Sequence, residues 1–172
     1  HNWSEIDPTK QTSITMHKQK KAFLNLKKNG EQRSIQDDRV SCANHFKEFA
    51  EKAAKGEVEV KGARIGLNDF TKEALELVQR GQLTSDEASI LNAQWLNNSK
   101  QTGALGKMIA MVDVSLSMNG DPMNAAIALG IRVAEKSMLG KRVMTFSASP
   151  SWVNLQGQDK FVDMVNTVRR AD

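Results

Sequence analysis

The sequence contains few of the residues and patterns that mark disulfide-rich, membrane and secreted proteins. Of its 172 residues only 1 is Cys, so the chain cannot form an internal disulfide, which favours a reducing compartment. The longest apolar runs are interrupted well before the roughly 20 residues that a membrane span needs. The first residues, His1–Glu5, have neither the basic start nor the apolar stretch of a signal peptide. We therefore expect an intracellular, cytoplasmic protein with no membrane partner.

Groups suited to catalysis are also scarce. The three histidines, His1, His17 and His45, show no metal-ligand spacing with one another or with Cys42. No G-x-S-x-G turn is present, and no His follows residue 45 to act as the base for a nucleophilic serine. No phosphate-binding G-x-x-x-x-G-K-[ST] loop follows a strand either. The sequence therefore predicts that the chain is not an enzyme, and that Cys42 is a buried structural thiol.

Positive charge is concentrated near the N-terminus. The net charge is +4, and six lysines lie between Pro8 and Gly30 with no acid among them. Such a patch could bind the phosphates of RNA or another nucleic acid. The alternative is an ordinary solvated surface beside a partner. The residues that we single out as a nucleic-acid candidate are Lys18, Lys20, Lys21, Lys27 and Lys28.

The first 106 residues are mainly helical by their pattern. Apolar residues recur at steps of three and four, and glycines follow the first three helical segments. The segment Glu57–Ile65 alternates weakly, which predicts a short strand or an extended connection. The polar stretch Asn97–Gly106 is interpreted as the domain boundary. The expected helices are Met16–Leu26, one capped by Asp37 or Asp38, one capped by Asn68 or Asp69, and one that starts near Ser85 and buries Trp95.

From residue 107 the pattern changes to that of an α/β domain. Met108–Val112 is a continuous apolar run of strand length, which predicts a strand covered on both faces in a parallel sheet. Pro122 suits the first turn of a helix that extends to Leu139. Arg142–Phe146 is expected to be a second buried strand, which completes a strand–helix–strand unit. A short third strand, parallel or antiparallel to the second, is expected at the sheet edge over Trp152–Leu155, followed by a helix over Asp159–Arg170.

Three oxygen-bearing side chains follow the first strand at alternate positions: Asp113, Ser115 and Ser117. Ligands of α/β sheets bind at the carboxyl ends of strands. One carboxylate and two hydroxyls suit Mg²⁺ or Mn²⁺ better than Ca²⁺, which takes more oxygen ligands. The alternative is structural: Asp113 caps the turn and the serines satisfy backbone groups. The spacing alone leaves both interpretations open.

The segments VDVSLSM, GDPMNAAIALGIRVAE and RVMTFSASPSW resemble the beginning of a von Willebrand factor A domain. Together with TVRRAD, they resemble the uncharacterised A-domain-like proteins of plants and large DNA viruses. KAFLNLKKNGEQRS, RVSCANHF and the stretch around Trp95 extend the resemblance to that family's helical N-terminal region. The resemblance covers Lys21–Asp172.

The resemblance implies a doubly wound parallel sheet, with Asp113, Ser115 and Ser117 as the first loop of a metal-ion-dependent adhesion site. The family usually has Gly where this chain has Leu116, which reduces the freedom of the loop to curl. The family also uses a Thr and a further Asp from later loops, so we expect a truncated α/β domain. In this prediction residues 1–106 form a helical region and residues 107–172 form the first half of the A-like domain.

Three functions follow from these patterns. The first, which the resemblance to A domains implies, is a protein-binding module in which a metal ion, where it is held, captures an acidic group of a partner. The second is nucleic-acid binding through the basic helical region. The third is a structural or assembly role, such as a homo-oligomer or a virion component, because the first strand would present a bare edge unless further residues or a partner cover it.

Overall fold

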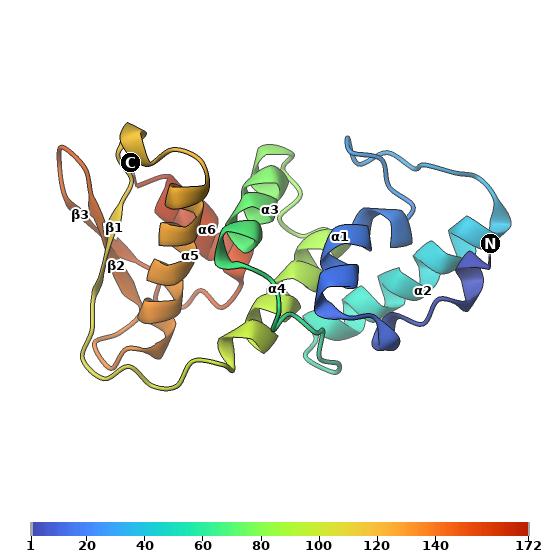
Figure 1. Cartoon of the computed structure of the whole chain (residues 1–172), viewed down its shortest axis with the longest axis horizontal. Coiled ribbons are helices and arrows are strands. Elements are labelled where there is room, and N and C mark those ends of the chain that lie inside the picture. The colour runs from blue at the N-terminus through green and yellow to red at the C-terminus, as the bar shows by residue number, and fades with distance from the viewer. Residues whose placement is uncertain (1, 172) are drawn as a thin grey trace. The chain divides into compact units, whose positions relative to one another are not determined.

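The computed structural model describes residues 2–171, with Leu116 described through its backbone only (Figure 1). The chain divides into two compact units that are discontinuous in sequence. Unit 1 contains the residues up to Ile65 and Thr84–Asn98. Unit 2 contains Gly66–Leu83 and the residues from Ser99 onwards.

Unit 1 is helical. Its regular elements are η1 (Trp3–Glu5), η2 (Pro8–Lys10), α1 (Ser13–Phe23), α2 (Asp37–Ala54) and α4 (Asp86–Ser99), of which α4 ends one residue beyond the unit. Helix α4 begins where the sequence predicts, because the Ser85 hydroxyl accepts the backbone N–H of Ala88 at 3.2 Å. Phe23 of α1 and Phe46 of α2 stack with their ring centroids 4.5 Å apart. Cys42 and Trp95 are fully buried, which confirms the prediction for both.

The segment Glu57–Ile65 forms no strand. It is an extended connection that hydrogen-bonds to side chains of α4. The backbone N–H of Gly62 donates to Asn97 Oδ1 at 2.8 Å, and Asn98 Nδ2 donates to the Gly62 carbonyl at 3.0 Å. A Cβ at position 62 would lie 2.1 Å from the Gln94 carbonyl oxygen, so only glycine allows this close approach.

Unit 2 combines helices with a three-stranded mixed sheet. Its elements are α3 (Leu67–Gln79), β1 (Ala110–Asp113), η3 (Leu116–Met118), α5 (Asp121–Lys136), β2 (Arg142–Phe146), β3 (Ser151–Asn154) and α6 (Phe161–Arg169). The strand order is β1-β2-β3. β1 and β2 are parallel, whereas β2 and β3 are antiparallel. The predicted bounds of β2 are therefore confirmed. β3 is an antiparallel edge strand, but it begins and ends one residue before the predicted Trp152–Leu155. β1 lies at the other edge of the described sheet.

Helices cover one face of this sheet. Helix α5 approaches β1 closely at Gly130, where an added Cβ would lie 2.5 Å from Val112 Cγ2. Helix α3 packs on α5 and α6: the Thr71 hydroxyl donates to the Asn124 carbonyl at 2.6 Å, and the rings of Phe70 and Phe161 meet edge to face at 5.8 Å. The predicted domain boundary at residue 106 would separate α3 from α5 and α6, although these three helices belong to one compact unit.

The prediction that the first strand is covered on both faces is wrong for the described residues. Val112 is buried under α5, but Met111 on the opposite face is 64% exposed. Phe146 of β2 and Trp152 of β3 are also exposed. An apolar run does not distinguish a strand buried on both faces from one whose second face is apolar yet uncovered, because both have the same composition.

Candidate functional site

The candidate site is the loop between β1 and α5. The pairing of β1 with β2 continues one residue past the strand, since the Val114 N–H donates to the Phe146 carbonyl at 3.1 Å. The chain then turns: the Ser115 N–H donates to Asp113 Oδ1 at 2.9 Å, and the Met118 N–H donates to the Ser115 carbonyl at 2.9 Å. These bonds fold the D-x-S-x-S segment into a compact turn at the carboxyl end of β1.

The turn brings the three predicted ligand side chains together. The hydroxyl oxygens of Ser115 and Ser117 lie 3.0 Å apart and share a hydrogen bond. Hydrogen bonds from the hydroxyl and then from the backbone N–H of Ser115 lower the pKa of the Asp113 carboxyl. Asp113 is therefore a carboxylate at neutral pH. A series of hydrogen bonds connects it through Ser115 to Ser117.

The start of α5 completes the loop. Gly120 adopts φ 91°, a conformation that glycine reaches without strain. Asp121 and Pro122 occupy the first helical turn, as the sequence predicts. The Asn124 N–H donates to the Gly120 carbonyl at 3.0 Å. The free N–H groups of the helix start add a partial positive charge beside the loop, which favours a nearby anion.

The donor set determines which ion the loop could hold. Asp113, Ser115 and Ser117 offer only oxygen atoms, which are the ligands of hard cations such as Mg²⁺ and Mn²⁺. Their clustering fits such a cation, with Asp113 as the one anionic ligand and water at the remaining positions. Among residues 2–171, no group of three or more His, Cys, Asp or Glu side chains is arranged to hold a metal ion. The same hydrogen bonds also satisfy the structural alternative, in which Asp113 caps the turn.

The five lysines of the nucleic-acid candidate have different surroundings. Lys18 and Lys28 are exposed. Lys20 is buried, with 1% of its surface exposed, so it is not available to a phosphate in this structure. Lys21 lies 3.6 Å from the buried carboxylate of Glu87, and Lys27 lies 3.3 Å from Glu31. The linear cluster therefore does not become one open basic surface, and nucleic-acid binding stays a prediction.

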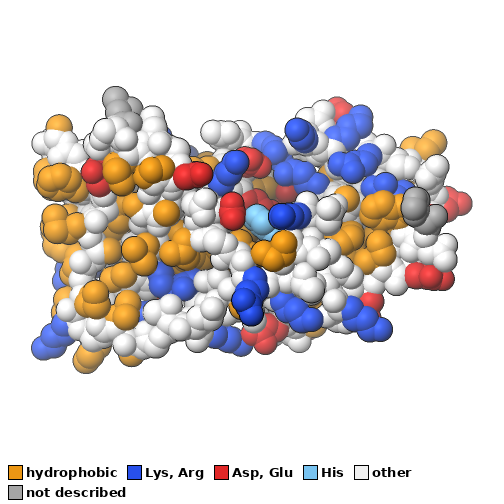
Figure 2. Space-filling model, viewed as in Figure 1, with side chains coloured by type: hydrophobic (Ala, Val, Ile, Leu, Met, Phe, Trp, Pro, Cys, Tyr) orange, Lys and Arg blue, Asp and Glu red, His pale blue; other side chains and the backbone are white. Residues whose placement is uncertain are grey.

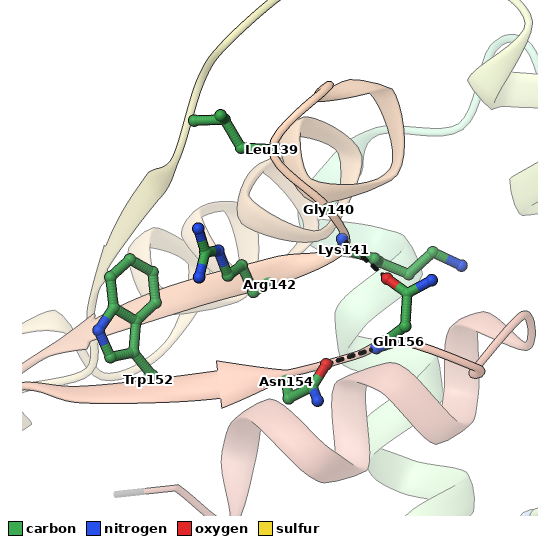
Figure 3. Close-up of a pocket in the computed structure, with 7 residues that line it drawn as sticks. All are labelled: Leu139, Gly140, Lys141, Arg142, Trp152, Asn154 and Gln156. Carbon is green, nitrogen blue, oxygen red and sulfur yellow. Dashed lines mark hydrogen bonds between the residues drawn. The ribbon is translucent and has the colours of Figure 1, made fainter.

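The sequence interpretation missed the residues on the open face of the sheet. An open cavity of about 430 Å³ lies at one end of this face, between the start of β2 and the end of β3 (Figure 3). Arg142 stacks over the Trp152 ring there, with the guanidinium carbon 4.9 Å from the ring centroid. Asn154 and Gln156 contribute polar groups to its lining. Alternate spacing in RVMTF places Arg142, Met144 and Phe146 on one face, but it does not indicate whether that face is covered.

No helix within residues 2–171 is both long enough and apolar enough to cross a membrane.

Comparison with known proteins finds similarity to a domain family of unknown function and to a viral protein. Residues 107–172 match the family model of a domain of unknown function, DUF7788. The chain is also 32% identical over 177 residues to an uncharacterised protein of Acanthamoeba polyphaga mimivirus, and the match covers 99% of this chain and 29% of that protein. The chain thus spans less than a third of that relative. No solved structure matches. The similarity is therefore to a domain family of unknown function and to an uncharacterised viral protein.

Proposed function

We propose that the chain carries a protein-binding module, in which the loop from Asp113 to Ser117 holds Mg²⁺ or Mn²⁺ and presents it to an acidic group of a partner. The observation that carries the proposal is the clustering of three oxygen-bearing side chains in one turn at the carboxyl end of β1. A purely structural turn requires the Asp113 carboxylate but does not require two adjacent hydroxyls at 3.0 Å.

We also propose that residues 107–172, which lie in unit 2, have the element order that begins a von Willebrand factor A-like fold. Two features support this proposal. The parallel pair β1 and β2 is connected through α5, and the D-x-S-x-S turn lies between β1 and that helix. The antiparallel β3 then continues the sheet on the far side of β2. The coarser description, a mixed α/β unit and a helical unit in one chain, does not depend on this proposal.

Each residue of the loop has a separate part in binding. The Asp113 carboxylate supplies the charge that attracts the cation, and its lowered pKa keeps it ionised at neutral pH. The Ser115 and Ser117 hydroxyls would coordinate the cation through their oxygen lone pairs. The hydrogen that they now share would have to rotate away from the ion. A bound cation supplies a positive charge for the partner's carboxylate. The start of α5 adds a weaker attraction for the same anionic group.

The experiment is a Mg²⁺ titration of the 172-residue chain, followed by its thermal unfolding temperature. We expect this temperature to rise with Mg²⁺, because a ligand that binds only the folded state stabilises it. Asp113→Ala should abolish the rise. Asp159→Ala is the matched control, since Asp159 is an exposed acid outside the loop, and it should leave the rise intact.

A second measurement detects a cation that binds too weakly to change the unfolding temperature. Mn²⁺ broadens the NMR signals of nuclei close to it, so we expect selective loss of the backbone amide signals of residues 113–118 in the wild type and not in Asp113→Ala. Equal broadening in both proteins, together with equal thermal shifts, would contradict the proposal and leave the loop with a structural role.

A further inference from the structure

The turn between β2 and β3, residues 147–150, lies beside the loop from Asp113 to Ser117. β1 and β2 are parallel, so their carboxyl ends meet at the same edge of the sheet. Asp113 is the register partner of Phe146, and the Val114 N–H donates to the Phe146 carbonyl at 3.1 Å. The chain therefore leaves the two strands side by side. In open α/β sheets helices cover the faces, whereas ligands bind at this edge.

Ser147 lies on the side of the sheet where the Asp113 loop runs into α5. Side chains alternate along a strand. Val143 of β2 lies under α5, and Thr145 is buried on the same face. Ser147 follows Thr145 by two residues and continues this alternation. It is half-buried, whereas the next three residues of the turn are exposed.

Hydrogen bonds hold the turn at its base. The buried Thr145 hydroxyl and the Ser151 hydroxyl lie 2.9 Å apart and share a hydrogen bond. Within the turn, the Ser149 N–H donates to the Ser147 hydroxyl oxygen at 3.4 Å. This bond uses a lone pair of the oxygen, so the hydroxyl hydrogen of Ser147 remains available to an acceptor.

The turn has no charge of its own. No Asp, Glu, Lys or Arg occurs between Phe146 and Asn154. Figure 2 shows mostly hydrophobic and uncharged atoms over the part of the molecule that carries the three strands. The turn therefore does not repel a carboxylate that approaches the Asp113 loop. A neutral hydroxyl there can donate a charge-assisted hydrogen bond to that carboxylate.

We propose that Ser147 is a second contact for the partner's acidic group, which is a carboxylate held between the cation and the Ser147 hydroxyl. One carboxylate oxygen binds the cation, and the other accepts the hydroxyl hydrogen. This inference rests on the proposed function, because it requires a cation on Asp113, Ser115 and Ser117. Ser147 orients the carboxylate and is not itself a ligand of the cation.

The test uses the 172-residue chain with Mn²⁺ and acetate as probes. Loss of the electron paramagnetic resonance signal of free Mn²⁺ measures cation binding. Faster NMR relaxation of the acetate carboxylate carbon measures acetate held beside the ion. We expect Ser147→Ala to leave the Mn²⁺ affinity unchanged and to weaken acetate binding by about three- to tenfold, because a hydrogen bond to a charged group is lost. Asp113→Ala should lose both.

Two further variants separate the Ser147 hydroxyl from the shape of the turn. Ser149→Ala removes an exposed hydroxyl and keeps the N–H that bonds to Ser147, so it should bind acetate as the wild type does. Ser147→Thr keeps a hydroxyl and should retain most of the acetate binding. Circular dichroism checks that each variant remains folded.

The outcomes separate this inference from the proposed function. Bound Mn²⁺ with equal acetate affinity in the wild type and Ser147→Ala would overturn the role of Ser147 alone. A weaker Mn²⁺ affinity in Ser147→Ala would also overturn it, since Ser147 would then be a ligand of the cation. A wild-type chain that binds no Mn²⁺ would overturn the proposed function, and the role of Ser147 with it.

Discussion

At the scale of single residues, Asp38 shows how one carboxylate attaches the N-terminal segment to unit 1. Its two oxygens accept the N–H of Ser4 at 2.8 Å and that of Trp3 at 3.0 Å. These hydrogen bonds, first from Ser4 and then from Trp3, lower the pKa of Asp38. A pKa that is lowered in the folded state contributes stability above the ordinary range of Asp, and the contribution is lost as the pH falls through the folded pKa.

We therefore expect Asp38→Asn to reduce the free energy of unfolding at neutral pH and to have a progressively smaller effect as the pH falls below about 4. Urea unfolding of both proteins over a series of pH values measures the difference. Asp37→Asn removes the preceding negative charge of α2 and leaves the hydrogen bonds from Trp3 and Ser4 to Asp38 in place. It is the control, and it should lower the free energy of unfolding at neutral pH less than Asp38→Asn does. A difference between wild type and Asp38→Asn that stays constant down to strongly acid pH would show that the charge of Asp38 is not the cause.

At the scale of elements, the packing of α5 on the sheet depends on a glycine. An added Cβ at Gly130 would lie 2.5 Å from Val112 Cγ2, so helix and strand would have to separate. We expect Gly130→Ala to lower the free energy of unfolding by about 1–3 kcal/mol from overpacking, although alanine's better helix propensity returns up to about 1 kcal/mol. Gly103→Ala is the control, because no atom lies within 4 Å of its added Cβ. Urea unfolding measures the free energy of unfolding of both variants. A Gly130→Ala variant that is more stable than the wild type would contradict the close approach of α5 to Val112.

At the scale of the whole molecule, the division into two units predicts where destabilisation spreads. Gly62→Ala places a Cβ 2.1 Å from the Gln94 carbonyl oxygen within unit 1, whereas Gly130→Ala acts within unit 2. Hydrogen exchange measured by mass spectrometry should therefore show faster exchange in residues 2–65 and 84–98 for the first variant. For the second variant it should show faster exchange in 66–83 and 99–171, because local unfolding follows cooperative units. Equal acceleration throughout the chain in both variants would show that the units unfold as one.

The local elements of this protein follow from its sequence to a large extent. The start of a helix can be predicted from the sequence where a nearby side chain caps it. At α4 the Ser85 hydroxyl accepts the backbone N–H of Ala88, only three residues away. The bounds of β2, and the position of the antiparallel β3 to within one residue, follow from short apolar runs and the turn between them. The Asp113 turn is also local: its hydrogen bonds span two or three residues. The sequence therefore predicted which oxygens gather there, while the presence of a cation stays a prediction.

What only the tertiary structure decided is which surfaces are covered. The lysines of α1 are close in sequence, yet Lys20 is buried and Lys21 faces Glu87, because a helix turns about 100° per residue and sends neighbours to different sides. Helix α3 precedes the linker but packs with α5 and α6, since packing depends on position in space. The apolar run Met108–Val112 predicts a strand, which the structure places at Ala110–Asp113. Only the fold determined that α5 covers Val112 and that Met111 stays open, because burial of each face depends on elements distant in the chain.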